Sequence, residues 1–86
     1  MELRKIYNRV SVFREERNIS RKELAEKIGV NFQTIGYLER GEFNPSLDLA
    51  LRISEFFELP IEVIFSSKPL TLLSKELLHQ KTKKGK

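Results

Sequence analysis

A short segment of the chain carries residues at the spacing of one helix face: Gln33, Gly36, Tyr37 and Arg40. Since a helix turns by about 100° per residue, this face lies opposite Ile35 and Leu38, which point inward. A glutamine amide offers one donor and one acceptor, the pattern that matches N6 and N7 of adenine in the major groove of DNA. This face is either ordinary solvated surface or, if the helix enters the major groove of DNA, a surface that reads a base pair, with Gln33 as the best candidate for the direct contact.

The neighbours of Gln33 fit the same chemistry in different ways. Gly36 costs a helix about 1 kcal/mol relative to alanine. It is a tolerated surface residue unless the helix belongs to a DNA-binding motif, in which case we favour a place where DNA approaches the helix closely. Tyr37 can hydrogen-bond a phosphate or pack against a thymine methyl group. Phe32, at the leading edge of the face, either stacks on sugar or methyl groups or covers the edge of the domain.

Helix caps predict where the segment that carries this face begins and ends. The residues SRKE at 20–23 form a capping box, in which the serine hydroxyl accepts from the glutamate amide and the carboxylate accepts from the serine amide. The helix that follows ends at Gly29, which can adopt positive φ, and Asn31 then caps a second helix that ends near Gly41. Two short helices joined through Gly29 and Val30 form a helix-turn-helix.

Further helices are predicted on both sides of this pair. Apolar spacing predicts a first helix over about residues 8–17, and residues 1–7 are an extension that either continues this helix or precedes it. Ser46 caps a long helix over 47–57, and Pro60 precedes a short last helix. No segment alternates with period two for long enough to predict a strand. The fold class is therefore all-α, a compact bundle of about five short helices with a central helix-turn-helix.

Composition and charge distribution limit the classes of function. The 86 residues suffice for one domain, and the content of 40% hydrophobic and 33% charged residues is typical of a soluble globular protein. With no cysteine and no apolar run long enough for a signal peptide or a membrane span, we expect a cytoplasmic protein. The net charge of +4 is concentrated near the C-terminus, because residues 8–65 carry −2 and residues 66–86 carry +5. Any DNA contact in the central region must therefore rest on where individual charges lie.

An enzyme is not expected from the residue types present. The single histidine, His79, lies in the polar C-terminal tail, and the sequence has neither a glycine-rich phosphate loop nor a histidine cluster spaced for a metal. We therefore expect no catalytic residues, no metal site and no cofactor.

Three stretches of the chain, FREERNISRKELAEKIGV, QTIGYLERGEFNPSLDLALRIS and IEVIF, resemble the phage-repressor and Cro-like helix-turn-helix regulators of the XRE family. The resemblance covers residues 8–65 and implies a lambda-repressor-like domain whose second motif helix enters the major groove. It further implies a prokaryotic transcriptional regulator, a repressor that binds a palindromic operator on double-stranded DNA as a homodimer. Two alternatives use the same fold: the antitoxin of a toxin–antitoxin pair, which has a protein partner, and an adaptor that bridges proteins.

Further site residues follow from this resemblance. Arg21 stands where the family places a residue that anchors the DNA backbone, commonly a glutamine. The other phosphate contacts are expected at Thr34, Arg40, Asn44 and Ser46. Glu42 would point away from the phosphates, and Arg17 would belong to a solvated face. Arg14 and Glu39 occupy positions that often form a partly buried ion pair between the first helix and the reading helix.

The C-terminal tail, residues 66–86, is apolar at first and basic at its end. Its leucines are too numerous for a simple disordered end, and Leu49 and Phe56 lie about 90° from the buried stripe of the long helix. The tail either folds back over Leu49 and Phe56 or, as we favour, packs against a second subunit. The candidate dimerisation residues are Leu49, Phe56, Leu70, Leu72, Leu73 and Leu77.

Overall fold

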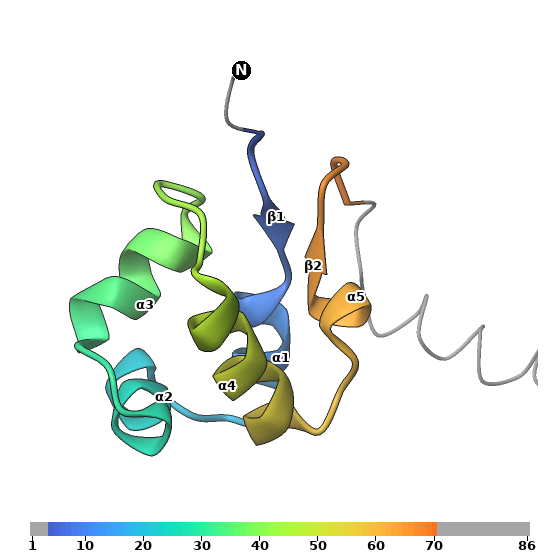
Figure 1. The fold of residues 1–86 in the computed structure, drawn as a ribbon. Helices are drawn as coiled ribbons and strands as arrows, with labels where there is room; N and C mark the ends of the chain where they lie inside the picture. The colour runs from blue at the N-terminus through green and yellow to red at the C-terminus, as the bar shows by residue number, and fades with distance from the viewer. Residues whose placement is uncertain (1–3, 71–86) are drawn as a thin grey trace, which may run out of the picture.

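Residues 4–70, the part of the chain that the computed structural model describes, form five helices and a two-stranded antiparallel ribbon (Figure 1). The elements are β1 (Tyr7–Asn8), α1 (Val10–Glu16), α2 (Arg21–Ile28), α3 (Phe32–Glu39), α4 (Leu47–Phe57), α5 (Ile61–Ile64) and β2 (Phe65–Ser66). The all-α prediction is confirmed, with the ribbon as a small addition. Within this part of the chain, no helix is both long and apolar enough to cross a membrane.

Local caps hold the two helices of the helix-turn-helix, α2 and α3. The Ser20 hydroxyl accepts from the amide of Glu23 at 3.0 Å, and a Glu23 carboxylate oxygen accepts from the amide of Ser20 at 2.8 Å. Gly29 ends α2 with a φ of +78°, in the left-handed region that glycine tolerates. Asn31 then caps α3, because its side-chain oxygen accepts from the amide of Gln33 at 2.8 Å. The two ends of α2 and the start of α3 are therefore set by residues close together in sequence.

The hydrophobic core gathers side chains from all five helices, and α2 packs most extensively on α3. Its largest fully buried side chains are Val10, Leu24, Ile35, Leu38, Ile53, Phe57 and Ile64. Each side chain of this size contributes about 1.5–3 kcal/mol when it leaves water. Because Ile35 and Leu38 are both fully buried, α3 is fixed in rotation, and its opposite face is turned to solvent.

The N-terminal extension forms a strand instead of a continuation of the first helix. β1 pairs antiparallel with β2, Asn8 lies opposite Phe65, and α1 begins only at Val10. The Asn8 side chain accepts from the amide of Val10 at 3.0 Å and donates to the Leu38 carbonyl at 2.9 Å. A helix through β1 would lose the ladder bonds and both side-chain contacts, which explains the difference from the predicted helix start.

Arg17 is exposed, as expected, and its side chain also caps the end of α4. Its Nη2 donates to the Phe57 carbonyl at 2.6 Å and its Nη1 to the Phe56 carbonyl at 3.3 Å. The last carbonyls of a helix have no partner within the helix and carry partial negative charge, so a cation is favourable there. The guanidinium also lies 5.1 Å from the centroid of the Phe57 ring.

Leu49 and Phe56, predicted as dimerisation residues, both pack against other residues of their own domain. Leu49 belongs to the core and exposes 8% of its surface. Phe56 packs edge-on against Phe57, with ring centroids 5.0 Å apart, and the guanidinium of Arg17 lies 5.7 Å from its ring. Phe56 is half-buried beneath Arg17, the residue that follows α1, and the role of Leu49 and Phe56 in dimerisation stays a prediction.

Other apolar side chains of α4 face solvent instead. Leu47 exposes 72% of its surface and Leu51 exposes 42%. Of the tail residues named as dimerisation candidates, Leu70 is half-buried. Leu72, Leu73 and Leu77 lie outside the described residues.

Candidate nucleic-acid interface

The outer face of α3 presents the side chains that the sequence assigns to base reading. Gln33 is exposed, and Phe32 and Tyr37 expose 53% and 47% of their surface. The other face of the same helix, with Ile35 and Leu38, is completely buried. Because its inner face is packed, α3 can present its outer face as a rigid unit to a groove.

Arg40 covers the middle of this outer face. Its guanidinium lies 5.2 Å from the centroid of the Tyr37 ring, and Nη1 lies 3.1 Å from the position that a Cβ on Gly36 would occupy. Gly36 is therefore buried beneath Arg40. DNA can reach the backbone at Gly36 only after the Arg40 side chain moves aside.

Glu42 contacts Arg40, and its expected orientation away from DNA phosphates stays a prediction. Arg40 Nε donates to a carboxylate oxygen of Glu42 at 2.9 Å, and this hydrogen bond raises the pKa of Arg40 above its ordinary value. The attraction of the nearby guanidinium explains this contact. Arg40 thus has a protein partner that a DNA phosphate would have to replace.

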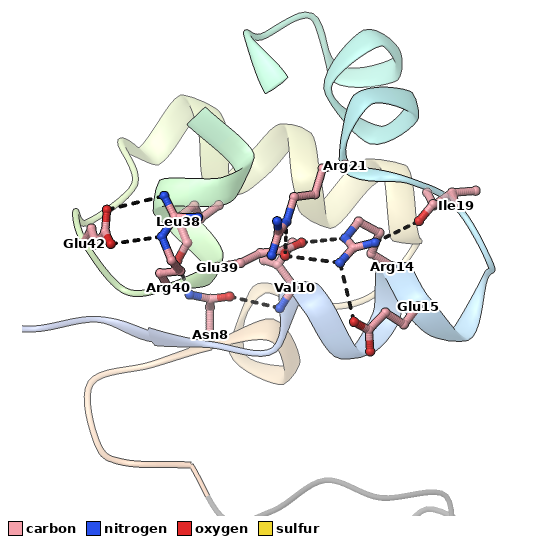
Figure 2. Close-up of polar contacts among 10 residues, drawn as sticks. All are labelled: Asn8, Val10, Arg14, Glu15, Ile19, Arg21, Leu38, Glu39, Arg40 and Glu42. Carbon is pink, nitrogen blue, oxygen red and sulfur yellow. Dashed lines mark hydrogen bonds and ion pairs between the residues drawn. The ribbon is translucent and has the colours of Figure 1, made fainter. Parts of the chain in front are cut away.

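Glu39 joins three helices through its carboxylate (Figure 2). It accepts from Arg14 Nε of α1 at 2.7 Å and from Arg21 Nε of α2 at 3.0 Å. Only 2% of the Glu39 side chain and 11% of the Arg14 side chain are exposed. The hydrogen bond to Glu39 raises the pKa of Arg14, whose Nη1 also donates to the Ile19 carbonyl at 2.9 Å. The structure therefore brings Arg14 and Glu39 together as a nearly dry ion pair and adds Arg21 to it.

Arg21, the expected backbone anchor, is held on one side and open on the other. Its side chain is 46% exposed, and Glu39 occupies Nε. Its two terminal nitrogens have no hydrogen-bond partner among residues 4–70. A guanidinium in this state can still offer donors to a phosphate while its orientation is already set.

Two further expected phosphate contacts lie at helix N-termini. Thr34 is half-buried in the first turn of α3. Ser46 caps α4, where its hydroxyl oxygen accepts from the amide of Leu49 at 3.1 Å. The unpaired amides of a first helical turn favour an anion, so both residues lie where a phosphate would be stabilised.

Asn44 binds the N-terminal segment of its own chain. Its Oδ1 accepts from the amide of Ile6 at 2.9 Å, and its Nδ2 donates to the carbonyl of Arg4 at 2.5 Å. Both polar ends of the side chain are thus engaged, although we expected them to contact a phosphate.

Comparison with known proteins reveals the family. A family model described as helix-turn-helix matches residues 12–64. An uncharacterized HTH-type transcriptional regulator of Archaeoglobus fulgidus is 46% identical over 57 residues, which span 66% of this chain and 80% of that protein. The chain belongs to the XRE family of helix-turn-helix regulators. A second relative of this XRE-family chain, from Methanocaldococcus jannaschii, is 43% identical over 58 residues, spanning 67% of the chain and 88% of the relative.

Two solved structures share the fold of the XRE-family domain. A protein from Bacteroides fragilis superposes with a TM-score of 0.64 at 24% identity and covers 71% of this chain and 98% of its own. A transcriptional regulator from Listeria innocua gives a TM-score of 0.61 at 20% identity and covers 91% of this chain and 76% of its own. At these identities the likeness establishes the fold.

Three contacts of the XRE-family domain escaped prediction from its sequence: the bond from Arg21 to Glu39, the cap that Arg17 places on α4, and the engagement of Asn44. The first had a signal, because a carboxylate at the core margin attracts the cations within reach. The other two join a side chain to backbone groups 38 to 40 residues away. Backbone amides and carbonyls occur at almost every position, so residue types and their spacing do not indicate which of them a distant side chain will bind.

Proposed function

We propose that this chain is a sequence-specific, double-stranded-DNA-binding transcriptional regulator that represses its target by occupying a palindromic operator as a homodimer in the cytoplasm. One observation carries the proposal: exposed side chains project from the outer face of α3 while its inner face is fully buried. Relatives named as transcriptional regulators support the same conclusion. Occupancy of an operator represses because it excludes other proteins from that DNA.

In this proposal the outer face of α3 reads the base pairs. Gln33 donates to N7 and accepts from N6 of adenine, and a good bidentate contact of this kind discriminates by about 1–3 kcal/mol. Phe32 and Tyr37 supply apolar contact to thymine methyl groups and sugars. Gly36 allows the helix backbone to come close to the base edges once Arg40 has moved.

Phosphate contacts on either side of the reading helix set its register. Arg21 contributes its free terminal nitrogens, and Arg40 exchanges Glu42 for a phosphate. Thr34 and Ser46 act with the backbone amides of the helix N-termini. These contacts carry no sequence information, so they fix the position from which Gln33 reads.

A second copy completes the operator contact. The exposed Leu47 and Leu51 on α4 offer apolar surface, and the leucines of the tail beyond residue 70 offer more. We propose that the tail packs against the partner subunit, and that the lysines after Gln80 add sequence-independent attraction to DNA.

The proposal is tested by selecting bound duplexes from a pool with a random central region. Repeated selection should enrich one motif present as two inverted half-sites, with centres about one helical turn, roughly 34 Å, apart. Enrichment of a lone half-site would contradict the dimer. Weak binding without enrichment of any sequence would contradict base reading and favour a protein-bridging adaptor. Recovery of a stoichiometric toxin with the native protein would favour an antitoxin.

A further inference from the structure

The N-terminal segment ahead of β1, residues 4–6, is attached to the loop between α3 and α4. Asn44 makes both attachments, since its amide accepts from Ile6 N and donates to Arg4 O. A neighbouring β-strand would also hydrogen-bond an amide and a carbonyl two residues apart, so the Asn44 side chain takes the place of a strand here. The ribbon of β1 and β2 holds the same segment from its other end. The backbone of residues 4–6 is therefore placed before any ligand arrives.

The side chain of Lys5 lies across the end of α3. Its Cε and Nζ lie 3.1 Å and 3.4 Å from the position that a Cβ on Gly41 would occupy, and Gly41 adopts a φ of +73°. Nζ also lies 5.3 Å from the centroid of the Tyr7 ring. A residue with a side chain at position 41 would push Lys5 away, so the glycine both allows the turn and leaves room for this lysine.

The segment adds positive charge at the C-terminal end of the reading helix. Arg4 and Lys5 are both exposed, and neither forms an ion pair with a carboxylate among residues 4–70. A hollow between this segment and the end of α3 is lined by Lys5, Tyr7, Arg40 and Gly41 among others. Arg4 and Lys5 precede the central region, residues 8–65, whose net charge is −2, and they place two cations beside the face that we assign to base reading.

We propose that residues 4–6, held by Asn44, form a second DNA-contacting element whose Arg4 and Lys5 bind backbone phosphates of the same duplex that α3 reads. This proposal rests on the proposed function and extends it to a segment outside the helix-turn-helix. A basic side chain on a free chain end loses conformational entropy when it binds, and a segment already held by the fold loses less. Asn44 is accordingly a positioning residue, because it acts on DNA through Arg4 and Lys5.

The salt dependence of DNA binding tests the phosphate contacts. The affinity of the full chain for a random-sequence duplex is measured between 50 and 200 mM salt for the wild type, Lys5→Ala, Arg4→Ala and Lys27→Ala. Each lost phosphate contact should reduce the magnitude of the log–log salt slope by about 0.9. We expect this reduction for Lys5→Ala and Arg4→Ala. Lys27→Ala removes the same charge from the far end of α2 and should leave the slope unchanged.

A double-mutant cycle tests the role of Asn44. If Asn44 positions Lys5, the Lys5→Ala substitution should change the slope much less in an Asn44→Ala background than in the wild type. If Asn44 contacts DNA directly, the two losses will add, and the positioning role is overturned. Circular dichroism at each point shows that the variants are folded.

Different results would overturn the proposed function and the DNA contact by residues 4–6. A wild type that binds no duplex at 50 mM salt would overturn the proposed function. A wild type that binds DNA, with equal salt slopes for Lys5→Ala, Arg4→Ala and Lys27→Ala, would overturn the contact by residues 4–6 and leave the proposed function standing.

Discussion

Arg14 and Glu39 form an ion pair of 2.7 Å between α1 and α3, and only 2% of the Glu39 side chain reaches solvent. A carboxylate this deeply buried is strongly unfavourable unless cations and hydrogen bonds compensate its lost hydration. Here Arg14 supplies one cation and Arg21 supplies a second on the other carboxylate oxygen. The buried carboxylate of Glu39 therefore links the reading helix both to α1 and to one proposed phosphate anchor.

Replacing Glu39 by glutamine tests this link. Glutamine keeps the shape but removes the charge, so Arg14 would remain buried beside a neutral group. We expect a loss of about 3 kcal/mol in the free energy of unfolding, measured by urea denaturation. Glu15→Gln is the control, because this acid lies 3.5 Å from Arg14 but is 71% exposed, and its loss should stay below about 1 kcal/mol. A Glu39→Gln variant as stable as this control would show that the buried pair contributes nothing.

Gln33→Ala and Arg21→Ala should affect DNA binding in different ways. Without Gln33, preference at one base pair in each half-site should fall by about 1–3 kcal/mol, while affinity for random DNA stays nearly constant. Without Arg21, affinity should fall on all sequences alike, and the salt slope should flatten. Titration of each variant with selected and random duplexes separates the two effects. Equal losses on both duplexes for Gln33→Ala would remove Gln33 from base reading.

Gly36→Ala is expected to stabilise the domain and to weaken its binding to DNA. Alanine is better than glycine inside a helix by about 1 kcal/mol. The added Cβ would meet only the end of the Arg40 side chain, which can move. We therefore expect Tm to rise by about 4–8 °C, while affinity for the selected duplex falls because the methyl group stands where DNA approaches.

Gly29→Ala serves as the contrasting variant. Its φ of +78° makes alanine unfavourable by about 1–2 kcal/mol, although the nearest side-chain atom, 3.5 Å from the added Cβ, leaves enough space. A Gly36→Ala protein with raised Tm and unchanged affinity would show that close approach at this position is not used.

Removal of the tail tests the proposed dimer, and the structure shows where to cut. Truncation after Phe65 would divide β2, whereas truncation after Leu70 leaves the ribbon complete. The chain that ends at Leu70 should be a folded monomer by analytical ultracentrifugation. It should lose affinity for a two-half-site duplex much more than for a single half-site. A truncated chain that sediments as a dimer would place the interface elsewhere, with the exposed Leu47 and Leu51 as the next residues to substitute.

Elements held by contacts between near neighbours could be predicted from the sequence. The caps at Ser20, Asn31 and Ser46 have partners within three residues, so residue type and spacing suffice to locate α2, α3 and α4. The rotation of α3 followed from the apolar spacing of Ile35 and Leu38, because an inward stripe leaves one outer face.

Contacts between distant parts of the chain could not be predicted in this way. The ribbon joins backbone groups of two-residue strands, which are too short for any alternating pattern. The angle of Phe56 on α4 placed it beside the buried stripe, but that angle says nothing of Arg17, which is 39 residues away in sequence and contacts it. The resemblance to a family implied that Arg14 and Glu39 form an ion pair. The additional contact from Arg21 to the same carboxylate was seen only in the structure.

The ribbon of β1 and β2 also sets an order of events during synthesis of the protein. α2 and α3 are capped by neighbouring residues, so both helices can form while the rest of the chain is still being made. Asn8 can pair with Phe65 only after the intervening residues have left the ribosome. Closing so long a loop costs conformational entropy before any hydrogen bond between β1 and β2 has formed. The residues that cap α2 and α3 are therefore all present in a nascent chain before β1 can pair, and only emergence of the last turn of the domain allows its first strand to reach its final position.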